Sequence, residues 1–237
     1  MIVISQPTYL PWIGYFSLIN AADHFIFLDD VQFDSRSWQQ RNRILINGNV
    51  NYLTVPVIKK GLSKQLINNT TIASNDVFKK HLLKIKHAYS KTKYFKEYYP
   101  KIENIITKCN NMINLSEINI HIIKEITKIL NLKCEFTNSS ELDCPGKRSL
   151  KLINICNRLK KNDYLINEGS KKYVNEDISL FKKNNIKIYT IKYNDVYYEQ
   201  FNDVFVKKLS IIDVLFNKGP ETINFIKNNY KLISFDF

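Results

Sequence analysis

Two short apolar runs near the start of the chain, joined by a helix-sized segment, limit the folds that it can adopt. Ile2-Val3-Ile4 ends in a polar turn, and a second apolar run, His24–Leu28, ends in Asp29-Asp30. Between them, apolar residues over 12–22 recur at helical spacing. A strand, a loop, a helix and a second strand form a βαβ unit, whose two strands are parallel. The sequence therefore predicts an α/β fold in which ligands lie beyond the carboxyl ends of the strands.

The rest of the chain continues this alternation and is mostly helical in its middle. Further strands are expected over 43–46, 50–57, 133–136, 163–166 and 186–191, and further helices over 76–89, 90–109, 116–130, 149–159, 175–184, 210–215 and 221–229. This pattern predicts a Rossmann-like fold, with a largely parallel sheet flanked by helices and a helical middle section. The polar segment 138–147 is the best boundary. We expect an N-terminal portion, 1–137, and a C-terminal portion, 138–237, that pack as one compact unit.

The sequence contains neither a membrane span nor a secretory signal. No run of about eighteen apolar residues occurs, and the apolar start is short and lacks a basic flank. We therefore expect a cytoplasmic protein that does not insert into membranes. The four cysteines form no C-x-x-C pair, and no histidine stands near them at finger spacing, so reduced thiols and no metal site are expected.

The chain is basic, with a formal net charge of +13. Only five of its 35 basic residues are arginines, and the lysines are spread along the chain as doublets. Nucleic-acid-binding proteins usually cluster their basic residues on one face. The pattern therefore disfavours a nucleic-acid partner and is explained equally well by an anionic small substrate such as a nucleotide. Whether the chain forms a homo-oligomer stays open.

Polar loops at three predicted strand ends hold the first candidate site residues. Gln6 can donate and accept hydrogen bonds at once, which suits an amide or a sugar hydroxyl, although a plain turn stiffened by two prolines is an equal alternative. The acidic pair can act as a base, bind Mg²⁺ or only cap the next segment. The candidates are Ser5, Gln6, Tyr9 and Trp12 in the first loop, Asp29, Asp30 and Gln32 in the second, and Gly169, Ser170 and Tyr173 in the third.

Two basic segments add candidates for an anion-binding site. Three of the five arginines lie within the run 36–43, and guanidinium groups bind phosphate or carboxylate in bidentate fashion. A solvated surface strand is the alternative. A second basic pair follows a Pro-Gly turn and precedes a predicted helix, where backbone amides favour anions; an ordinary basic helix start explains it as well. These candidates are Arg36, Trp38, Arg41, Asn42 and Arg43 in the first segment, and Lys147 and Arg148 in the second.

Several familiar catalytic motifs are absent. The sequence has no G-x-x-x-x-G-K-[ST] loop, no G-x-G-x-x-G fingerprint and no G-x-S-x-G elbow. It has four histidines, His24, His81, His87 and His121, and the last three lie on predicted helices, where a structural role is expected. The chain is therefore neither a Walker-type nor a dinucleotide-fingerprint protein.

Long motifs along nearly the whole chain resemble those of the WbqC-like family. They read Q-P-T-Y-L-P-W-I-G-Y-F at 6–16, F-L-D-D-V-Q-F at 27–33, S-W-Q-Q-R-N-R-I at 37–44, L-T-V-P-V at 53–57, K-R-S-L at 147–150, E-G-S-K-K-Y at 168–173, Y-Y-E-Q-F at 197–201 and L-S-I-I-D-V-L-F-N at 209–217. The family usually has histidine immediately before Q-P, where this chain has Ser5. The catalytic group is therefore expected among Ser5, Asp29 and Asp30, and Gln200 joins the expected binding residues.

The resemblance implies a role in the biosynthesis of O-antigen or another surface polysaccharide. Some relatives are similar to proteins proposed to attach glycine or another acyl group to a dideoxy-amino sugar. Such amide formation needs an activated acyl donor or ATP, a base for the amine and stabilisation of an oxyanion. The expected substrate is a nucleotide-linked amino sugar. The opening strand, Q-P turn, helix and strand are also similar to the start of nucleotidylyltransferase-like ligases, which use ATP, but this likeness concerns the fold alone.

The sequence is also compatible with two other functions. One is a nucleotidyl- or glycosyl-transferase of the same pathway, which would release nucleotide or pyrophosphate without forming an amide. The other is a non-catalytic protein that binds a nucleotide or nucleic acid. For nucleic acid, the affinity would fall steeply with salt and would not depend on the Gln6 loop.

Overall fold

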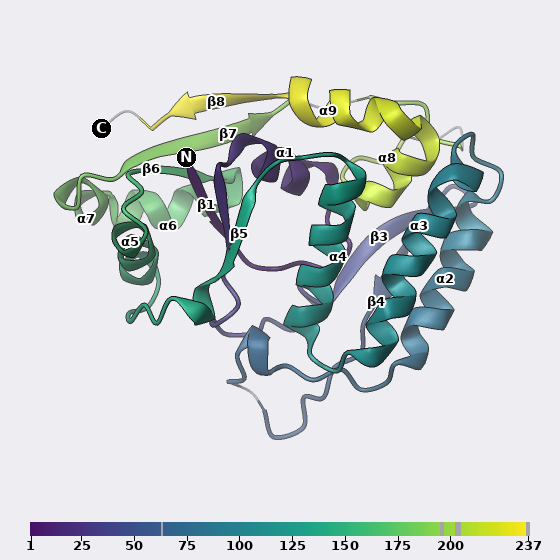
Figure 1. Ribbon diagram of the computed structural model, residues 1–237, viewed down its shortest axis with the longest axis horizontal. Coiled ribbons are helices and arrows are strands. Elements are labelled where there is room, and N and C mark those ends of the chain that lie inside the picture. Colours follow the sequence, from purple (N-terminus) through teal and green to yellow (C-terminus); the bar gives the residue numbers. More distant parts are fainter. Residues whose placement is uncertain (63, 195–196, 202–204, 236–237) are drawn as a thin grey trace.

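A mixed six-stranded sheet forms the frame of the molecule in the computed structural model, which describes residues 1–62, 64–194, 197–201 and 205–235. The strand order is β5-β2-β1-β6-β7-β8 (Figure 1). All neighbouring pairs are parallel except β7 and the edge strand β8. The strands span Ile2–Ser5 (β1), His24–Phe27 (β2), Glu135–Asn138 (β5), Asp163–Ile166 (β6), Lys187–Tyr193 (β7) and Tyr230–Ser234 (β8).

Side chains of alternating direction fill two cores, one on each face of the sheet. On β1, Ile2 and Ile4 belong to one core and Val3 to the other. The first core packs against α5 (Ser149–Arg158), α6 (Lys171–Glu176) and α7 (Ile178–Lys183). The larger second core packs against α1 (Ile13–Ala21) and α4 (Leu115–Ile129) and continues into the helical part of the chain. The central strands are thus buried on both faces, as in other parallel sheets.

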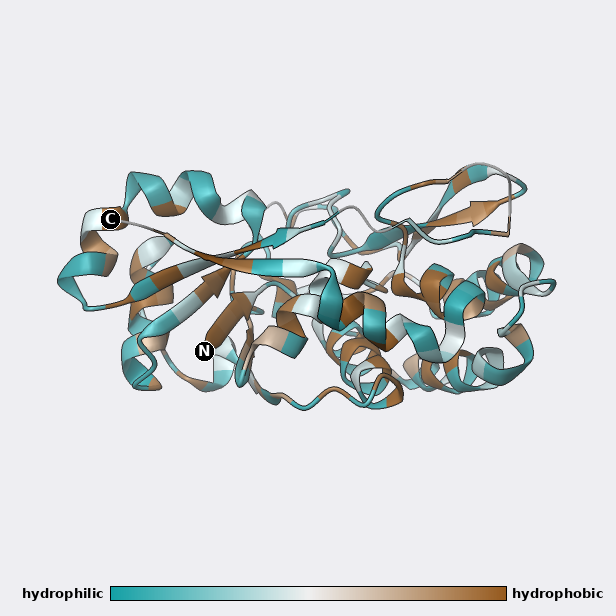
Figure 2. Ribbon diagram, turned by 90° about the horizontal axis from the view of Figure 1, so that it is seen from above, coloured by the Kyte–Doolittle hydropathy of each residue, from teal (hydrophilic) through white to brown (hydrophobic). Residues whose placement is uncertain are grey.

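The helical middle section lies beside the sheet and makes the molecule elongated (Figures 1 and 2). It consists of α2 (Asp76–Tyr89), α3 (Phe95–Lys108) and α4, and it packs against the hairpin of β3 (Arg41–Ile46) and β4 (Asn49–Thr54) and against α8 (Ile211–Lys218). Helix α9 (Thr222–Asn228) returns the chain to α1 and the sheet. The hairpin turn has positive φ at Asn47 and Gly48, the geometry that matches the twist of the two strands.

The observed architecture confirms the expected α/β class, the largely parallel sheet and the flanking helices. The helix over 76–89 and the strand over 163–166 have the predicted bounds. The single helix expected over 175–184 is wrong, because the chain forms α6 and α7 with a break at Asp177. The strand expected over 133–136 lies two residues later, and β8 was not anticipated.

Strands from both expected portions of the chain form the same sheet, with β1 of the first portion paired to β6 of the second. Short 3-10 turns join several elements; they span Ile67–Asn69, Cys109–Asn111, Ser139–Glu141, Glu168–Ser170 and Gly219–Glu221. Across the described ranges of the chain, no helix is both long and apolar enough to cross a membrane.

Candidate functional site

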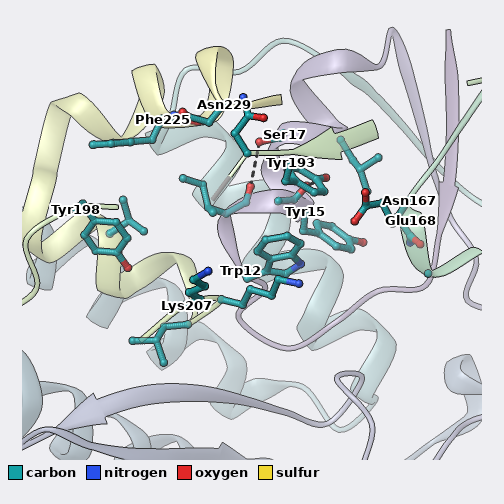
Figure 3. Close-up of a pocket in the computed structure, with 18 of the residues that line it drawn as sticks. Trp12, Tyr15, Ser17, Asn167, Glu168, Tyr193, Tyr198, Lys207, Phe225 and Asn229 are labelled. Atoms are coloured by element: carbon teal, nitrogen blue, oxygen red, sulfur yellow. Dashed lines mark hydrogen bonds between the residues drawn. The ribbon is translucent and has the colours of Figure 1, made fainter. Parts of the chain in front are cut away.

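A cavity of about 380 Å³ opens where the strand order reverses. The chain runs from β1 outward to β2 on one side, whereas β6 leads outward to β7 on the other. Loops at the carboxyl ends of β1 and β6 therefore leave in opposite directions and create a crevice, which is the usual ligand site of open parallel sheets. The cavity is lined by the start of α1, by 167–169 after β6, by the end of β7, by parts of 198–214 and by α9 and its end (Figure 3).

An aromatic group forms one wall of this cavity. The rings of Trp12 and Tyr193 meet edge to face with centroids 4.9 Å apart, and Tyr15 lies beside them (Figure 3). The Tyr193 hydroxyl donates to the carbonyl of Gly14. A Cβ atom at Gly14 would overlap the Trp12 ring, so a larger residue at this position would have to displace the ring. Burial raises the pKa of Tyr193 and Tyr15 well above the ordinary value, so both phenols stay protonated.

Polar groups line the cavity at the ends of β6 and β7. Asn167 accepts hydrogen bonds from the backbone N–H of Ser170 (2.9 Å) and from its hydroxyl (3.1 Å), and this fixes the turn after β6. Glu168 is exposed beside it and is the one carboxylate among the described residues that line the cavity. Asn194 and Asn229 add amide groups. These side chains can hydrogen-bond to hydroxyl or amide groups of a ligand.

Two lysines form the exposed rim of the cavity. Lys207 and Lys208 both line it, and the Lys208 ammonium lies 5.5 Å from the centroid of the Trp12 ring. Arg43 fixes this turn, because its Nη2 donates to the carbonyl oxygens of Lys207 (3.2 Å) and Lys208 (3.0 Å). The backbone N–H of Ser210 donates in return to the carbonyl of Arg43 (2.9 Å). The hairpin thus positions two cations at the entrance.

One side of the cavity is apolar apart from one hydroxyl. Tyr198, Phe205, Val214 and Phe225 line it, and Tyr198 lies at the side opposite Asn167 and Glu168 (Figure 3). The Tyr198 hydroxyl donates to the carboxylate of Asp213, 2.6 Å away, which is 1% exposed. Burial raises the pKa of Asp213 to about 6, although hydrogen bonds from neighbouring side chains oppose the shift.

The acidic pair that the sequence singled out lies at the end of β2 and does not line the cavity. Asp29 is buried, and its carboxylate accepts hydrogen bonds from the Ser139 hydroxyl (3.1 Å) and from the N–H (3.0 Å) and hydroxyl (2.7 Å) of Ser140. Asp30 forms an ion pair with Lys151, whose Nζ is 2.6 Å from Oδ2. Both contacts tie β2 to the segment after β5 and to α5. Asp29 thus caps the distant segment at 139–140, whereas the alternative given above was a cap on the segment that directly follows the pair. A catalytic role for either residue stays a prediction.

Ser5 and Gln6 lie just behind the aromatic wall. The hydroxyl of Tyr15 donates to the carbonyl of Gln6 (3.1 Å), and a hydrogen bond with Ser5 partly offsets the rise in the pKa of Tyr15. The Gln6 side chain is exposed and accepts from Nε2 of Gln39 (2.9 Å). Buried Asn119 of α4 donates to the carbonyls of Pro7 (3.2 Å) and Gln39 (2.7 Å). The first loop and the segment around Gln39 are therefore joined into one unit.

Three expected binding residues have buried side chains with protein partners. Tyr9 is 0% exposed and its hydroxyl shares a 2.8 Å hydrogen bond with Nδ1 of His81. Asn42 donates to the carbonyls of Tyr9 and Leu10. Gln200 donates to the carbonyl of Val206 and to the Asp213 carboxylate. In this conformation none of the three reaches the cavity, so the structure favours a structural role for each.

The other predicted residues divide between the cavity and separate surfaces. Trp12 and Gly169 line the cavity, and Ser170 supports it through Asn167. Trp38 and Tyr52 of the hairpin region are half exposed and stack on the guanidinium groups of Arg43 and Arg41, respectively. The remaining predicted residues are exposed and outside the cavity lining: Gln32, Arg36, Lys147, Arg148 and Tyr173.

Sequence reasoning missed the side chains that complete the cavity. They carry no recognisable motif, because they come together only when the end of β7 and the segment before α8 pack against the start of α1. These residues are Tyr193, Asn194, Lys207 and Lys208. Asp213 lay within a quoted motif, and an acid among apolar helical neighbours was the one available signal for a buried carboxylate. Among the residues described, no group of three or more potential metal ligands is found.

Comparison with known proteins identifies relatives of the chain. The family model described as "WbqC-like protein family" matches residues 6–225. The "Uncharacterized protein Rv1507c" of Mycobacterium tuberculosis is 30% identical over 227 residues, which cover 95% of this chain and 97% of that protein. No solved structure matches the chain. The matched range includes every residue that lines the cavity except Asn229.

Proposed function

Because the chain belongs to the WbqC-like protein family, we propose that it is a cytoplasmic enzyme of surface-polysaccharide biosynthesis. In this proposal it forms an amide by transferring an acyl or aminoacyl group, such as glycyl, to the amine of a nucleotide-linked dideoxy-amino sugar. The observation that supports a nucleotide sugar is the cavity at the strand reversal, with a fixed aromatic wall, several amides and two lysines at its rim.

The rim and the wall fit different parts of such a substrate. A diphosphate carries negative charge, and Lys207 and Lys208 provide two cations at the cavity entrance. Trp12 and Tyr193 offer flat apolar surfaces against which a sugar or a base can pack. Asn167, at the end of β6, can bind ring hydroxyls through its amide nitrogen, since its oxygen is already occupied by Ser170.

The chemistry sets requirements that the chain and its co-substrate would share. An activated acyl donor, or ATP with a free carboxylate, supplies the leaving group. The amine must also lose a proton to a base before or as the amide bond forms. Ser5, Asp29 and Asp30 do not line the cavity, so a direct role for them would require movement of the first loop or of the end of β2.

The test is to incubate the protein with dTDP-amino sugars, candidate acyl donors and ATP, and to analyse the products by mass spectrometry. The expected result is the mass gain of an acyl or aminoacyl group on one sugar. Changing Lys207 and Lys208 together to methionine should weaken nucleotide-sugar binding by about tenfold, because each charge contact at the solvent-exposed rim contributes up to ~1 kcal/mol.

A matched control changes an exposed lysine doublet far from the cavity. Lys79 and Lys80 lie on α2, and their replacement by methionine removes the same net charge. This variant should bind as the wild type does. A full panel without mass gain would rule out amide formation on the sugars tested. Release of nucleotide or pyrophosphate without an amide would instead identify a nucleotidyl- or glycosyl-transferase.

A further inference from the structure

A buried carboxylate that the proposed reaction does not use lies behind the Tyr198 side of the cavity. Asp213 on α8 accepts hydrogen bonds from Tyr198 (2.6 Å), from Tyr89 on α2 (2.8 Å) and from Gln200 (3.2 Å). Asn217, one helical turn later, approaches the same oxygen as Tyr198 at 3.5 Å. No cation lies among these partners, so the four side chains hold the carboxylate through neutral hydrogen bonds.

The two tyrosines reach Asp213 from different elements, and they differ in access to the cavity. Tyr89 is 2% exposed, and its hydroxyl also accepts the backbone N–H of Leu45 (3.3 Å), so it belongs to the core. Tyr198 lines the cavity. Its hydroxyl donates to Asp213 and accepts from Nε2 of Gln200 (3.1 Å), which leaves one lone pair. The phenol nearest the cavity is therefore fixed as a hydrogen-bond acceptor.

We propose that Tyr198 and Asp213 form a specificity-determining pair that binds the amine of the ligand at the Tyr198 side of the cavity. The proposal rests on the proposed function and specifies where the amino group of the sugar lies. Tyr198 would accept an N–H of the amine, and Asp213 would act through Tyr198 as a positioning residue. The two lysines and the Tyr198–Asp213 pair would then orient the substrate, with its phosphate at the lysines and its amine at Tyr198.

Electrostatics supports this orientation. A charge inside a protein interacts more strongly with its neighbours than a charge in water, because the surroundings are less polarisable. Burial and the nearby Asp213 carboxylate raise the pKa of Tyr198 well above its ordinary value, so the proton stays on the phenol and the negative charge stays on Asp213. Lys207 and Lys208 are exposed at the rim, where solvent screens them.

Glu168 is the competing partner for an amine, because it also lines the cavity. It lies at the opposite side from Tyr198 and is exposed to solvent (Figure 3). The two assignments make different predictions. If Glu168 binds the amine, Glu168→Gln should remove the preference for amines and Tyr198→Phe should not.

The experiment compares free glucosamine with glucose by saturation-transfer NMR and compares dTDP-amino sugars with the matching hydroxyl sugars by calorimetry. The wild type should prefer each amine by about tenfold or more, the fold-change expected for one hydrogen bond to a charged group. Tyr198→Phe and Asp213→Asn should reduce that preference to about threefold or less. Tyr89→Phe is the matched control, since it removes one hydroxyl bound to the same carboxylate, and it should keep the preference.

The outcomes separate this inference from the proposed function. Binding of dTDP sugars without any preference for the amine would overturn the inference and leave nucleotide binding intact. A preference for glucosamine that depends on Tyr198, without binding of dTDP sugars, would support the inference and contradict the proposed substrate. A preference that survives in Tyr198→Phe, or that disappears in Tyr89→Phe or Glu168→Gln, would also overturn the inference.

Discussion

Replacing Asp213 by asparagine should change how the stability of the protein depends on pH. The carboxyl group has an ordinary pKa of 3.8, and burial raises it to about 6 in the folded chain. Between these values the folded state holds a proton that the unfolded state has released. Stability therefore falls as pH rises through this window. With ~1.36 kcal/mol per pKa unit, Asp213 lowers the free energy of unfolding by about 3 kcal/mol at neutral pH relative to acidic pH.

Asparagine cannot titrate, so the variant lacks the pH-dependent loss of stability that Asp213 causes. The altered hydrogen bonds shift its stability by an amount that is the same at every pH. The difference in unfolding free energy, variant minus wild type, should accordingly rise by about 3 kcal/mol between pH 3.5 and pH 7. Urea denaturation at several pH values, followed by circular dichroism, measures this difference. A difference that stays flat within error would refute the claim that a buried carboxylate lies behind the cavity.

His81 provides a control of opposite sign. Its ring is buried against Tyr9, and burial lowers its pKa from 6.5 to about 4. The unfolded chain therefore binds a proton first as pH falls, and His81 reduces stability by roughly 3 kcal/mol below pH 4. In His81→Gln the difference from wild type should decrease as pH rises. Equal slopes in both variants would show that the two shifts do not have the assigned causes.

Three further substitutions test the packing around the site. Gly14→Ala should displace the Trp12 ring, which would shift the tryptophan fluorescence and weaken nucleotide-sugar binding by about tenfold. Unchanged fluorescence emission would contradict the close contact between Gly14 and the ring. Lys151→Met should lower the free energy of unfolding, measured by urea denaturation, by about 3 kcal/mol, because Asp30 loses the cation that it pairs with. Adding Asp30→Asn to this variant should restore part of that stability. Gly219→Ala should lower the free energy of unfolding by about 3 kcal/mol, because φ is positive at this position and a Cβ would overlap the Tyr94 ring. A loss below about 1 kcal/mol would argue against that geometry.

The sequence predicted the fold better than it predicted the site. The spacing of apolar residues is a local pattern within one helix or strand, so it predicts the bounds of single elements. The bounds of α2 and β6 are accordingly as predicted. The edge strand β8 was missed because its side chains are mostly exposed and it forms only through pairing with β7. Asp177 interrupts the helical region over 171–183, and apolar spacing alone does not show that break.

For the site, the sequence identified the first loop but not its partners. Trp12 follows a distinctive Pro-containing motif and lines the cavity as expected. The arginine cluster contributes to the cavity only indirectly. Arg43 binds the backbone carbonyls of Lys207 and Lys208, and the side chains of these lysines line the cavity. Asp29 and Asp30 were conspicuous as a pair, yet their nearest partners come from residues more than a hundred positions later, which local patterns cannot reveal.

We propose that the substrate binds in the cavity between the loops after β1 and β6. A crystal structure of the protein soaked with a dTDP-amino sugar tests this directly. The diphosphate is expected at Lys207 and Lys208, the sugar against Trp12, and the amine within hydrogen-bond distance of the Tyr198 hydroxyl. Ligand bound at Asp29 and Asp30, or on the hairpin surface around Arg41, with the cavity empty, would contradict it.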